Sequence, residues 1–421
     1  MKIWVVQTGE PLHIDGGNPR PMRAMNLSDR LVERGHEVVI WSSSFYHQEK
    51  IHRSKEFKEI SVSDRLTVKL IPSRGYSRNI GLGRLIDHAQ LAFNMNRILG
   101  DTSESKPDLA FIGFPPIELA SYMLSWLTKR GCPTILDIKD QWPSLFLEPF
   151  PNKLKPFVQF CLSPYFFLAR SAMKRATVVT TMSKGYLDWM YRFSDRKRTN
   201  IDQVIPLTGP RREHSVTQIN EGREWLRSIG VDASHDRRFV FIGSFMSVFD
   251  FTPVRDAAKK MLESDIDCQF VICGDGGSSN ELHELMSGLD NVLLPGWIDS
   301  SQMVALAQVS RGAIIPYKNI ENFTANLPNK VIDSLGLGLP IITQLEGELK
   351  KLIEQENVGL FSDGSEIDMY SNLIELLEDR KKVTEISERC LSLYERDFEH
   401  QTVYDRFVDL IEKTVSDSDS A

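Results

Sequence analysis

The chain has 421 residues, 41% of them hydrophobic and 25% charged, which is the composition of a soluble globular protein of two or three domains. This excludes a disordered chain, a collagen and a disulfide-stapled miniprotein. The five cysteines are scattered without a C-x-x-C pair, so we expect no zinc site and a reducing, cytoplasmic location. The net charge of −7 is uneven, because residues 1–205 hold 29 Lys+Arg against 20 Asp+Glu and the remainder holds 21 against 37. The basic part can attract phosphates of a lipid, a substrate or a nucleic acid, although solvated surface charge explains it equally well.

Apolar β-branched runs alternate with helical patterns from the N-terminus onward. Residues 2–6 predict a strand, residues 22–34 a helix that stops at Gly35, and residues 36–41 a second strand. This βαβ unit implies a parallel sheet with helices on both faces. Further strands are predicted at residues 109–113, 134–137 and 177–180.

A second α/β series begins near Arg238. Its predicted strands are residues 239–243, 268–273, 292–294, 312–316 and 340–343. Residues 206–234 are polar and poor in strand formers, so they are the predicted domain boundary. Because open parallel sheets bind ligands beyond the carboxyl ends of their strands, we expect the sites in the loops that follow the strands.

The loop after the first predicted strand has features of an anion site. Gly16 and Gly17 let the backbone approach a ligand, while Arg20 and Arg23 are spaced to grip a phosphate or carboxylate. A flexible loop with a solvated basic surface is the alternative. No G-x-G-x-x-G or P-loop motif is present.

Two further clusters carry chemistry. In the segment D-I-K-D-Q-W-P at 137–143, Lys139 and Asp140 follow a strand and are expected to project into a cleft, where they could position a sugar hydroxyl or neutralise a leaving group, although acidic residues also favour a helix N-terminus. In residues 317–343, Asn326 precedes a helix on which Lys330 and Asp333 share one face. Lysine suits phosphates and aspartate suits ribose hydroxyls; a surface ion pair is the alternative.

The ordered set of motifs resembles the retaining glycosyltransferases of family 4, which have the GT-B fold. The matching C-terminal segments are residues 241–244, 271–276, 291–297, 330–342 and 358–360. The N-terminal matches are the Gly16-Gly17 loop, residues 33–38, and the D-x-x-D-x-W-P element, which resembles the branch that builds bacterial surface polysaccharides.

The resemblance implies two Rossmann-like parallel-sheet domains facing across a cleft. Residues 1–205 would bind the acceptor, residues 206–391 the nucleotide-sugar, and the helices at 392–415 would cross back to the first domain. The implied reaction moves a sugar from a UDP- or GDP-sugar to a saccharide or lipid-linked acceptor with retention, without metal or cofactor, as in lipopolysaccharide assembly. The implied donor-binding residues are Gly243, Gly274, Asp275, Trp297, Asn326, Lys330 and Asp333, with Lys139 and Asp140 catalytic.

The chain departs from the family pattern at several positions. The E-x7-E signature falls on Ala325 and Asp333, and the usual basic pair falls on Ser244 and Phe249. A histidine frequent after the fourth strand falls on Lys139. These departures keep two alternatives open: a GT-B epimerase or hydrolase that acts on the donor alone, and a non-catalytic protein that binds nucleotide-sugar or a partner. Nucleic-acid binding is not expected, because the second half is acidic.

Residues 153–170 are aromatic and apolar between basic flanks. The segment is too short and too interrupted to span a bilayer, which needs about 20 apolar residues. It is expected either to lie on the inner membrane surface or to pack as a buried helix on the first sheet. The first alternative makes the protein peripheral at the cytoplasmic face.

Overall fold

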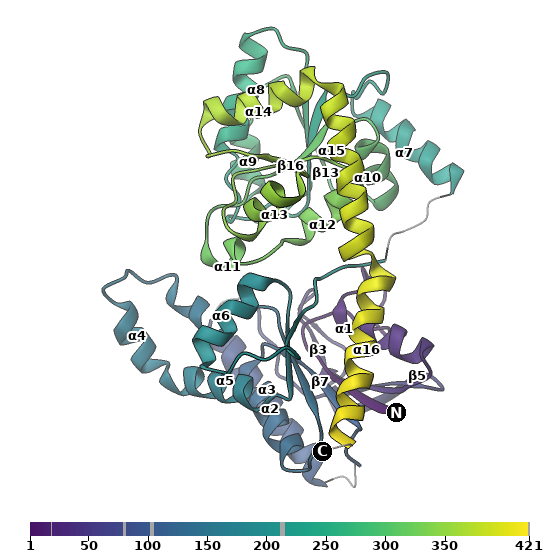
Figure 1. Cartoon of the computed structure of the whole chain (residues 1–421), viewed down its shortest axis with the longest axis vertical. Helices are drawn as coiled ribbons and strands as arrows, with labels where there is room; N and C mark the ends of the chain where they lie inside the picture. The colour runs from purple at the N-terminus through teal and green to yellow at the C-terminus, as the bar shows by residue number, and fades with distance from the viewer. Residues whose placement is uncertain (18, 79–80, 102–104, 211–214, 420–421) are drawn as a thin grey trace. The chain divides into compact units, whose positions relative to one another are not determined.

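The structure is a computed structural model that describes residues 1–17, 19–78, 81–101, 105–210 and 215–419. The chain forms two compact units (Figure 1): unit 1 is Met1–Gly209 with His400–Ala421, and unit 2 is Pro210–Glu399. The first break lies inside the predicted boundary segment, of which residues 211–214 are outside the described residues. The second break lies beyond residue 392, where the crossover was expected to begin.

Unit 1 is built on a largely parallel sheet. Within the described residues the strand order is β10-β9-β8-β7-β1-β2-β6-β5, and only β5 runs antiparallel to its neighbour. The strands are β1 (Lys2–Val6), β2 (Glu37–Ser43), β5 (Lys58–Ser63), β6 (Leu66–Ile71), β7 (Leu109–Phe114), β8 (Thr134–Ile138), β9 (Val178–Thr181) and β10 (Gln203–Val204), with a separate short hairpin of β3 (Phe45–Tyr46) and β4 (Ile51–His52).

Helices cover both faces of this sheet, as period-two burial along the strands requires. In β1, Ile3 and Val5 pack into a core with α1 and α16, whereas Trp4 and Val6 pack into a core with α2, α3, α5 and α6. The helices are α1 (Arg23–Glu33), α2 (Leu82–Asp101), α3 (Ile117–Thr128), α4 (Lys155–Cys161), α5 (Ser163–Arg175), α6 (Lys184–Ser194) and α16 (His400–Asp419), with a 3-10 turn at Ser144–Leu147.

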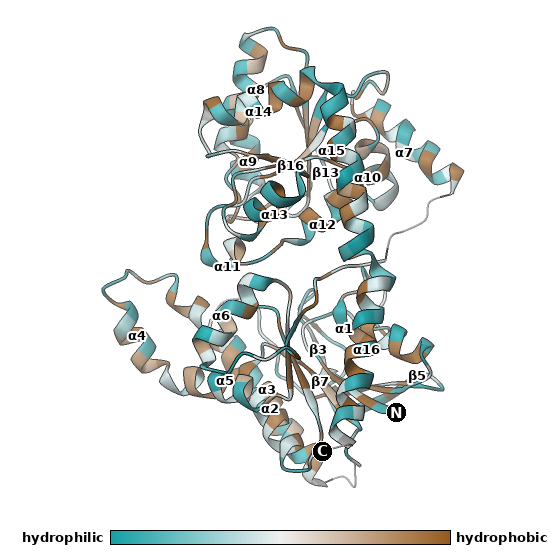
Figure 2. Ribbon diagram, viewed as in Figure 1, coloured by the Kyte–Doolittle hydropathy of each residue, from teal (hydrophilic) through white to brown (hydrophobic). Residues whose placement is uncertain are grey.

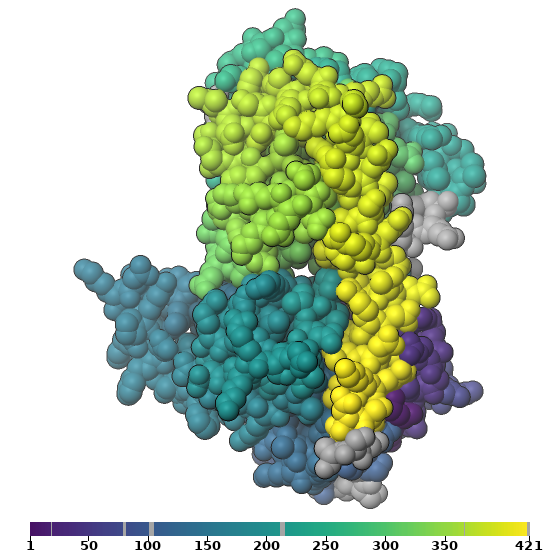
Figure 3. All heavy atoms as spheres, viewed as in Figure 1, coloured from purple at the N-terminus to yellow at the C-terminus, as the bar shows by residue number. Residues whose placement is uncertain are grey.

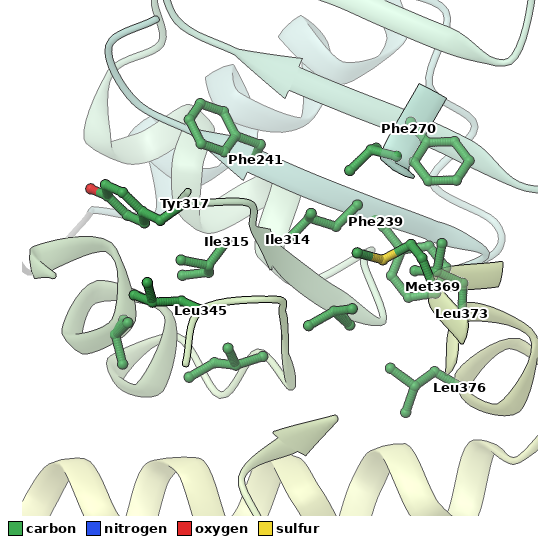
Figure 4. Close-up of a cluster of buried hydrophobic side chains, with 14 of the residues drawn as sticks. Phe239, Phe241, Phe270, Ile314, Ile315, Tyr317, Leu345, Met369, Leu373 and Leu376 are labelled. Atoms are coloured by element: carbon green, nitrogen blue, oxygen red, sulfur yellow. The ribbon is translucent and has the colours of Figure 1, made fainter. Parts of the chain in front are cut away.

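Unit 2 holds a parallel sheet with the order β13-β12-β11-β14-β15-β16 among the described residues. Its strands are β11 (Arg238–Ile242), β12 (Gln269–Cys273), β13 (Val292–Gly296), β14 (Gly312–Ile315), β15 (Ile341–Thr343) and β16 (Gly359–Phe361). Figure 4 shows its larger core, in which Phe239, Phe270 and Ile314 of the strands meet Met369 and Leu373 of α14.

The helices of unit 2 again cover both faces of the sheet. They are α7 (Val216–Ser228), α8 (Thr252–Glu263), α9 (Ser279–Leu285), α10 (Ser300–Ala307), α11 (Glu321–Thr324), α12 (Asn329–Gly336), α13 (Glu348–Glu356), α14 (Glu366–Glu378) and α15 (Arg380–Leu393), followed by a π-helical turn at Tyr394–Phe398. The polar boundary segment holds a folded helix, α7, which begins at a Ser215–Gln218 capping box and buries Gly222 and Leu226. Gly222 is small enough for the backbone of Ser301 on α10 to approach closely.

Candidate functional site

A pocket of about 250 Å³ lies in unit 1 at the carboxyl ends of the parallel strands. Segments that follow β1, β2, β7, β8 and β9 all contribute to it, which is where an open α/β sheet binds ligands. Its polar lining residues are Gln7, Thr8, Glu10, Ser43, His47, Tyr76, Arg84, Asp87, His88, Lys139 and Asp140. The pocket therefore includes both residues that the sequence predicts to be catalytic.

Lys139 and Asp140 differ in their surroundings. The Lys139 ammonium forms an ion pair with Glu10, whose other carboxylate oxygen accepts a hydrogen bond of 2.8 Å from the Ala24 amide. Burial raises the pKa of Asp140 to about 6, against the opposing effects of Arg84 and Lys139. A carboxyl group with a pKa near neutrality in a pocket is suited to holding or moving a proton.

A wall of four side chains, which we call the His–Arg wall, consists of His47, Tyr76, Arg84 and His88. Burial lowers the pKa of His47 to about 4 and that of His88 to about 3, and the charge of Arg84 lowers both further. Sequence reasoning missed all four residues, because they come from segments between residues 44 and 91 that carry no motif. Their only sequence signal is the clustering of His, Tyr and Arg side chains after strands.

Two buried polar atoms in the pocket have no hydrogen-bond partner among the described residues. They are Oε1 of Gln7 and Nδ1 of His88, on side chains whose residues are 5% and 4% exposed. Gln7 Oε1 occupies the space where any side chain at Gly113 would place its Cβ. Because a buried polar atom without a partner is costly, both atoms are candidates to bind a ligand or a water.

The first loop is only partly as expected. Gly16 and Gly17 are exposed, with nothing near their Cβ positions, and Arg20 is exposed beside Gly209. The expectation that Arg23 grips a ligand is wrong, because its side chain is fully buried. It lies 3.3 Å from Asp137 and donates a 2.7 Å hydrogen bond to the Ile205 carbonyl.

In unit 2, the predicted donor-binding glycines lie where two loops follow β11 and β12. A Cβ on Gly274 would lie 2.0 Å from the Gly243 carbonyl oxygen, and one on Gly243 would lie 1.4 Å from the Lys330 ammonium. Lys330 donates a 2.9 Å hydrogen bond to the Ile242 carbonyl. Glycine at position 243 thus lets Lys330 reach the end of β11, and glycine at position 274 lets the two loops approach closely.

Lys330 and Asp333 line a small cavity of about 40 Å³ beside β11 and β14. Asn326 lies on the loop before α12, and its buried side-chain oxygen has no partner among the described residues. Asp275 accepts a 2.7 Å hydrogen bond from the Gly276 amide and bonds to Ser279, while Trp297 after β13 is 62% exposed. Together with Gly243 after β11, these predicted residues follow four different strands of one sheet.

The usual basic pair of the family is replaced here by Ser244 and Phe249, and Phe249 has an aromatic environment. Phe249 is buried against Tyr317, with ring centroids 4.5 Å apart, and the Lys330 ammonium lies 5.5 Å from the Phe249 ring centroid. Lys318, which sequence reasoning missed, donates a 2.6 Å hydrogen bond to the Ser247 carbonyl in the same loop. An exposed cation thus stands beside the loop that lacks the usual pair.

Metal binding has no cluster to support it in the described ranges, since no group of three His, Cys, Asp or Glu side chains there could hold an ion. None of the described helices is long and apolar enough to cross a membrane.

The comparisons bear first on unit 2. Residues 236–379 match the family model of glycosyl transferases group 1. The matched part contains all seven predicted donor-binding residues. No curated protein sequence matches the chain.

The whole chain is similar to solved structures. Sucrose-phosphate synthase from Thermosynechococcus elongatus gives a TM-score of 0.69 at 12% identity, with 99% of each chain covered. WaaG, a glycosyltransferase involved in lipopolysaccharide biosynthesis, gives 0.65 at 12%, covering 98% of this chain and 99% of that one. HepE of Anabaena in complex with UDP gives 0.62 at 14%, covering 98% and 99%.

The fold is GT-B. Identities this low show the fold alone, so the reaction must be argued from the residues of the two units.

Proposed function

We propose that this protein is a retaining glycosyltransferase that moves a sugar from a nucleoside-diphosphate donor to a saccharide acceptor. The observation that carries the proposal is the set of donor residues at the strand ends of unit 2, inside the segment that matches group 1 glycosyl transferases. The reaction breaks the bond between the anomeric carbon and the diphosphate oxygen and forms one to an acceptor oxygen. The acceptor hydroxyl loses its proton in the process.

We assign the donor to unit 2. Lys330 reaches the end of β11 because Gly243 has no side chain there, and it binds the diphosphate. Asp333 binds the ribose hydroxyls. The exposed Trp297 offers a face for the base, and the partnerless oxygen of Asn326 accepts a hydrogen bond from the sugar. HepE binds UDP, and starch synthase IV from Arabidopsis thaliana binds ADP, which supports the same donor class here.

We assign the acceptor to the pocket of unit 1. Asp140 is largely ionised at neutral pH, because its pKa of about 6 lies below it, so it can accept a hydrogen bond from the acceptor hydroxyl and take its proton. Lys139 is held in place by Glu10. The reaction needs no metal in this proposal, because cations and the positive N-terminal ends of helices stabilise the diphosphate leaving group.

We also propose that unit 1 binds the cytoplasmic face of a membrane that carries a lipid-linked acceptor, as in bacterial surface-polysaccharide assembly. Phe157, Phe160 and Phe167 are 67%, 77% and 70% exposed, although Phe166 is buried. The segment of α4 and α5 that bears them projects from unit 1 (Figure 3) and includes apolar residues (Figure 2). Basic residues lie on both sides of the phenylalanines in the sequence: Lys153, Lys155, Arg170, Lys174 and Arg175.

Specific observations also favour two alternative functions. The residues at Ala325, Ser244 and Phe249 lack the charges that the resemblance leads one to expect, which favours a non-catalytic nucleotide-sugar-binding protein or an enzyme that rearranges or hydrolyses the donor alone. Release of nucleoside diphosphate separates the first alternative from an enzyme. Dependence of that release on an added acceptor separates the second from a transferase.

Donor binding is tested by calorimetric titration of the full chain with UDP, GDP and ADP. We expect one of them to bind, and Lys330→Ala and Asp333→Ala each to weaken it by about 1–3 kcal/mol, the value of a charge-assisted hydrogen bond. Lys381→Ala, an exposed lysine elsewhere in unit 2, is the matched control. Unchanged affinity in both site variants would refute the donor assignment.

A further inference from the structure

The His–Arg wall of the unit 1 pocket has a chemistry that sugar transfer alone does not require. Its four side chains come from three separate stretches: the turn after β3, the loop after β6 and the first turns of α2. Each of them lines the same pocket as Asp140. The wall is therefore assembled by the fold next to the proposed acceptor hydroxyl.

Hydrogen bonds hold His47 in a donor state toward the pocket. Its Nδ1 lies 2.6 Å from the Tyr76 hydroxyl and accepts a hydrogen bond of 3.1 Å from the Lys50 ammonium, which can only donate. The proton of the neutral imidazole must therefore be on Nε2, where it can be donated. Lys50 also lies over the Tyr76 ring, 4.8 Å from its centroid, so it adds positive charge behind the wall.

Arg84 is fixed by aromatic rings. Its guanidinium carbon lies 4.9 Å from the Trp142 ring centroid and 5.7 Å from that of Tyr76. His88, from the next turn of α2, is 4% exposed and has a partnerless Nδ1. Packing on aromatic rings favours a fixed position of the guanidinium at the pocket wall.

The acidic groups of the pocket are already engaged on this side. Asp87 accepts hydrogen bonds from the Gly75 amide at 2.7 Å and from the Ser73 hydroxyl, and Glu10 is paired with Lys139. Asp140 is the remaining carboxyl group among the lining residues. The wall thus presents hydrogen-bond donors and positive charge, and Asp140 presents an acceptor.

We propose that the His–Arg wall binds an anionic substituent of the acceptor, a phosphate or a carboxylate, while Asp140 binds the hydroxyl that receives the sugar. The proposal rests on the proposed function, because it names the substrate class of the same pocket. Arg84 and the imidazole N–H groups of His47 and His88 donate to the anion. An anion there also relieves the mutual repulsion of these groups: burial is the main cause that lowers the pKa values of His47, His88 and Lys50, and positive neighbours lower them further.

The test is calorimetric titration of the full chain with glucose 6-phosphate, glucuronate, glucose and inorganic phosphate. It is done in a Lys330→Ala background, so that the proposed diphosphate site of unit 2 cannot bind the phosphate. We expect the phosphorylated or the carboxylated sugar to bind at least tenfold more tightly than glucose, and Arg84→Gln to abolish that difference. Arg97→Gln, an exposed arginine on the same helix, should leave it unchanged.

If Arg84→Gln fails to fold, a second measurement still tests the proposal. The pKa values of His47 and His88 are followed by NMR in the Lys330→Ala protein, which retains Arg84. The bound anion should raise the pKa values of His47 and His88, and glucose should not. Equal binding of charged and neutral sugars, or binding of inorganic phosphate but of no charged sugar, would overturn the proposal. Titration of the protein that retains Lys330 with UDP, GDP and ADP distinguishes failure of this inference from failure of the proposed function. If nucleotide binds but no anionic sugar does, only this inference is wrong.

Discussion

The Asp140 carboxyl group has two testable roles, one in catalysis and one in the stability of the fold. Its folded-state pKa of about 6 lies above the ordinary 3.8, so the folded protein disfavours the charged form. The resulting cost is fully present above about pH 6 and disappears below about pH 4. We expect Asp140→Asn to raise the unfolding free energy by on the order of 1–2 kcal/mol at pH 7.5 and not at pH 4, while turnover falls much more than donor affinity.

Chemical denaturation at the two pH values, together with kcat and KM, measures both effects. Asp188→Asn is the control, since that carboxylate is paired with Lys184 and Arg198 at the surface. An Asp140→Asn protein with full turnover contradicts the catalytic assignment. A stability gain that persists at pH 4 contradicts the claim that the charged Asp140 carboxylate destabilises the folded protein.

Arg23 and Asp137 form a buried pair whose value is structural. We expect Arg23→Met to lower the free energy of unfolding by about 3–5 kcal/mol, because it leaves a buried carboxylate without its cation. Adding Asp137→Asn should recover a large part of the loss, since the uncompensated charge is then gone. Urea denaturation of both variants decides the matter, and equal stability of the single and double variants would show that the pair is uncoupled.

The sequence indicated the position of a side chain, though not its role, where that side chain directly follows a strand. Lys139 and Asp140 follow β8, and both line the pocket. Arg23 was misassigned because spacing cannot distinguish an arginine aimed at a ligand from one buried against Asp137. Arg84 and His88 could not be found, because only the tertiary fold brings α2 to the end of β8.

At the scale of elements, the exposed phenylalanines of the α4–α5 segment lead us to predict membrane binding. Each basic residue near an anionic leaflet contributes on the order of 1 kcal/mol, and the exposed phenylalanines add apolar burial. We expect flotation with anionic liposomes, weaker at high salt, and its loss in a Phe157→Ser, Phe160→Ser, Phe167→Ser variant. Since these side chains are exposed, the variant should keep the thermal stability of the parent.

Phe93→Ser is the matched control, because Phe93 is 61% exposed on α2 and lies outside the α4–α5 segment. If the parent protein remains in the soluble fraction at every lipid composition and salt concentration, the membrane proposal is wrong. Equal flotation of the triple variant would place the contact elsewhere in unit 1.

Strands were the elements that the sequence predicted best, because buried parallel strands are continuous apolar runs. The predicted runs at residues 2–6, 109–113 and 239–243 correspond to β1, β7 and β11. Strand β5 escaped prediction because it is an exposed edge strand without an apolar run, whereas β6 was missed although it is a largely buried apolar run. Helix α7 was taken for a boundary because its buried face is narrow, with only Gly222 and Leu226 buried.

At the scale of the whole molecule, α16 belongs to the core of unit 1 although it is distant in sequence. Val403, Tyr404, Phe407, Val408 and Ile411 are all buried there. Burying each large apolar side chain is worth about 1.5–3 kcal/mol, and together they match the 5–15 kcal/mol stability of a typical domain. We expect a chain ending at Glu399 to lose folded unit 1 and to retain folded unit 2.

Limited proteolysis and calorimetry of the truncated chain check this expectation. A protease-resistant fragment from residues 210–399 should survive, whereas residues 1–209 should be digested. Cooperative unfolding of residues 1–209 without α16 would show that the sheet and its other helices suffice. Addition of a peptide covering residues 400–419 should restore protection if the packing argument holds.

The sequence carried the architecture of two α/β units, because the alternation of strand and helix patterns repeats along the chain. It could not supply the substrate, since the residues that select one lie in loops and are joined only by the fold. The proposed glycosyl transfer therefore requires that unit 1 and unit 2 act in one reaction.

The measurement that tests this most directly is mass spectrometry of the full chain incubated with UDP- or GDP-sugars, with and without charged and neutral saccharide acceptors. The account predicts an acceptor enlarged by one sugar with the anomeric configuration of the donor. Nucleoside diphosphate should be released in equal amount and only when an acceptor is present. Release without an acceptor, or donor binding without any release under all these conditions, would contradict it.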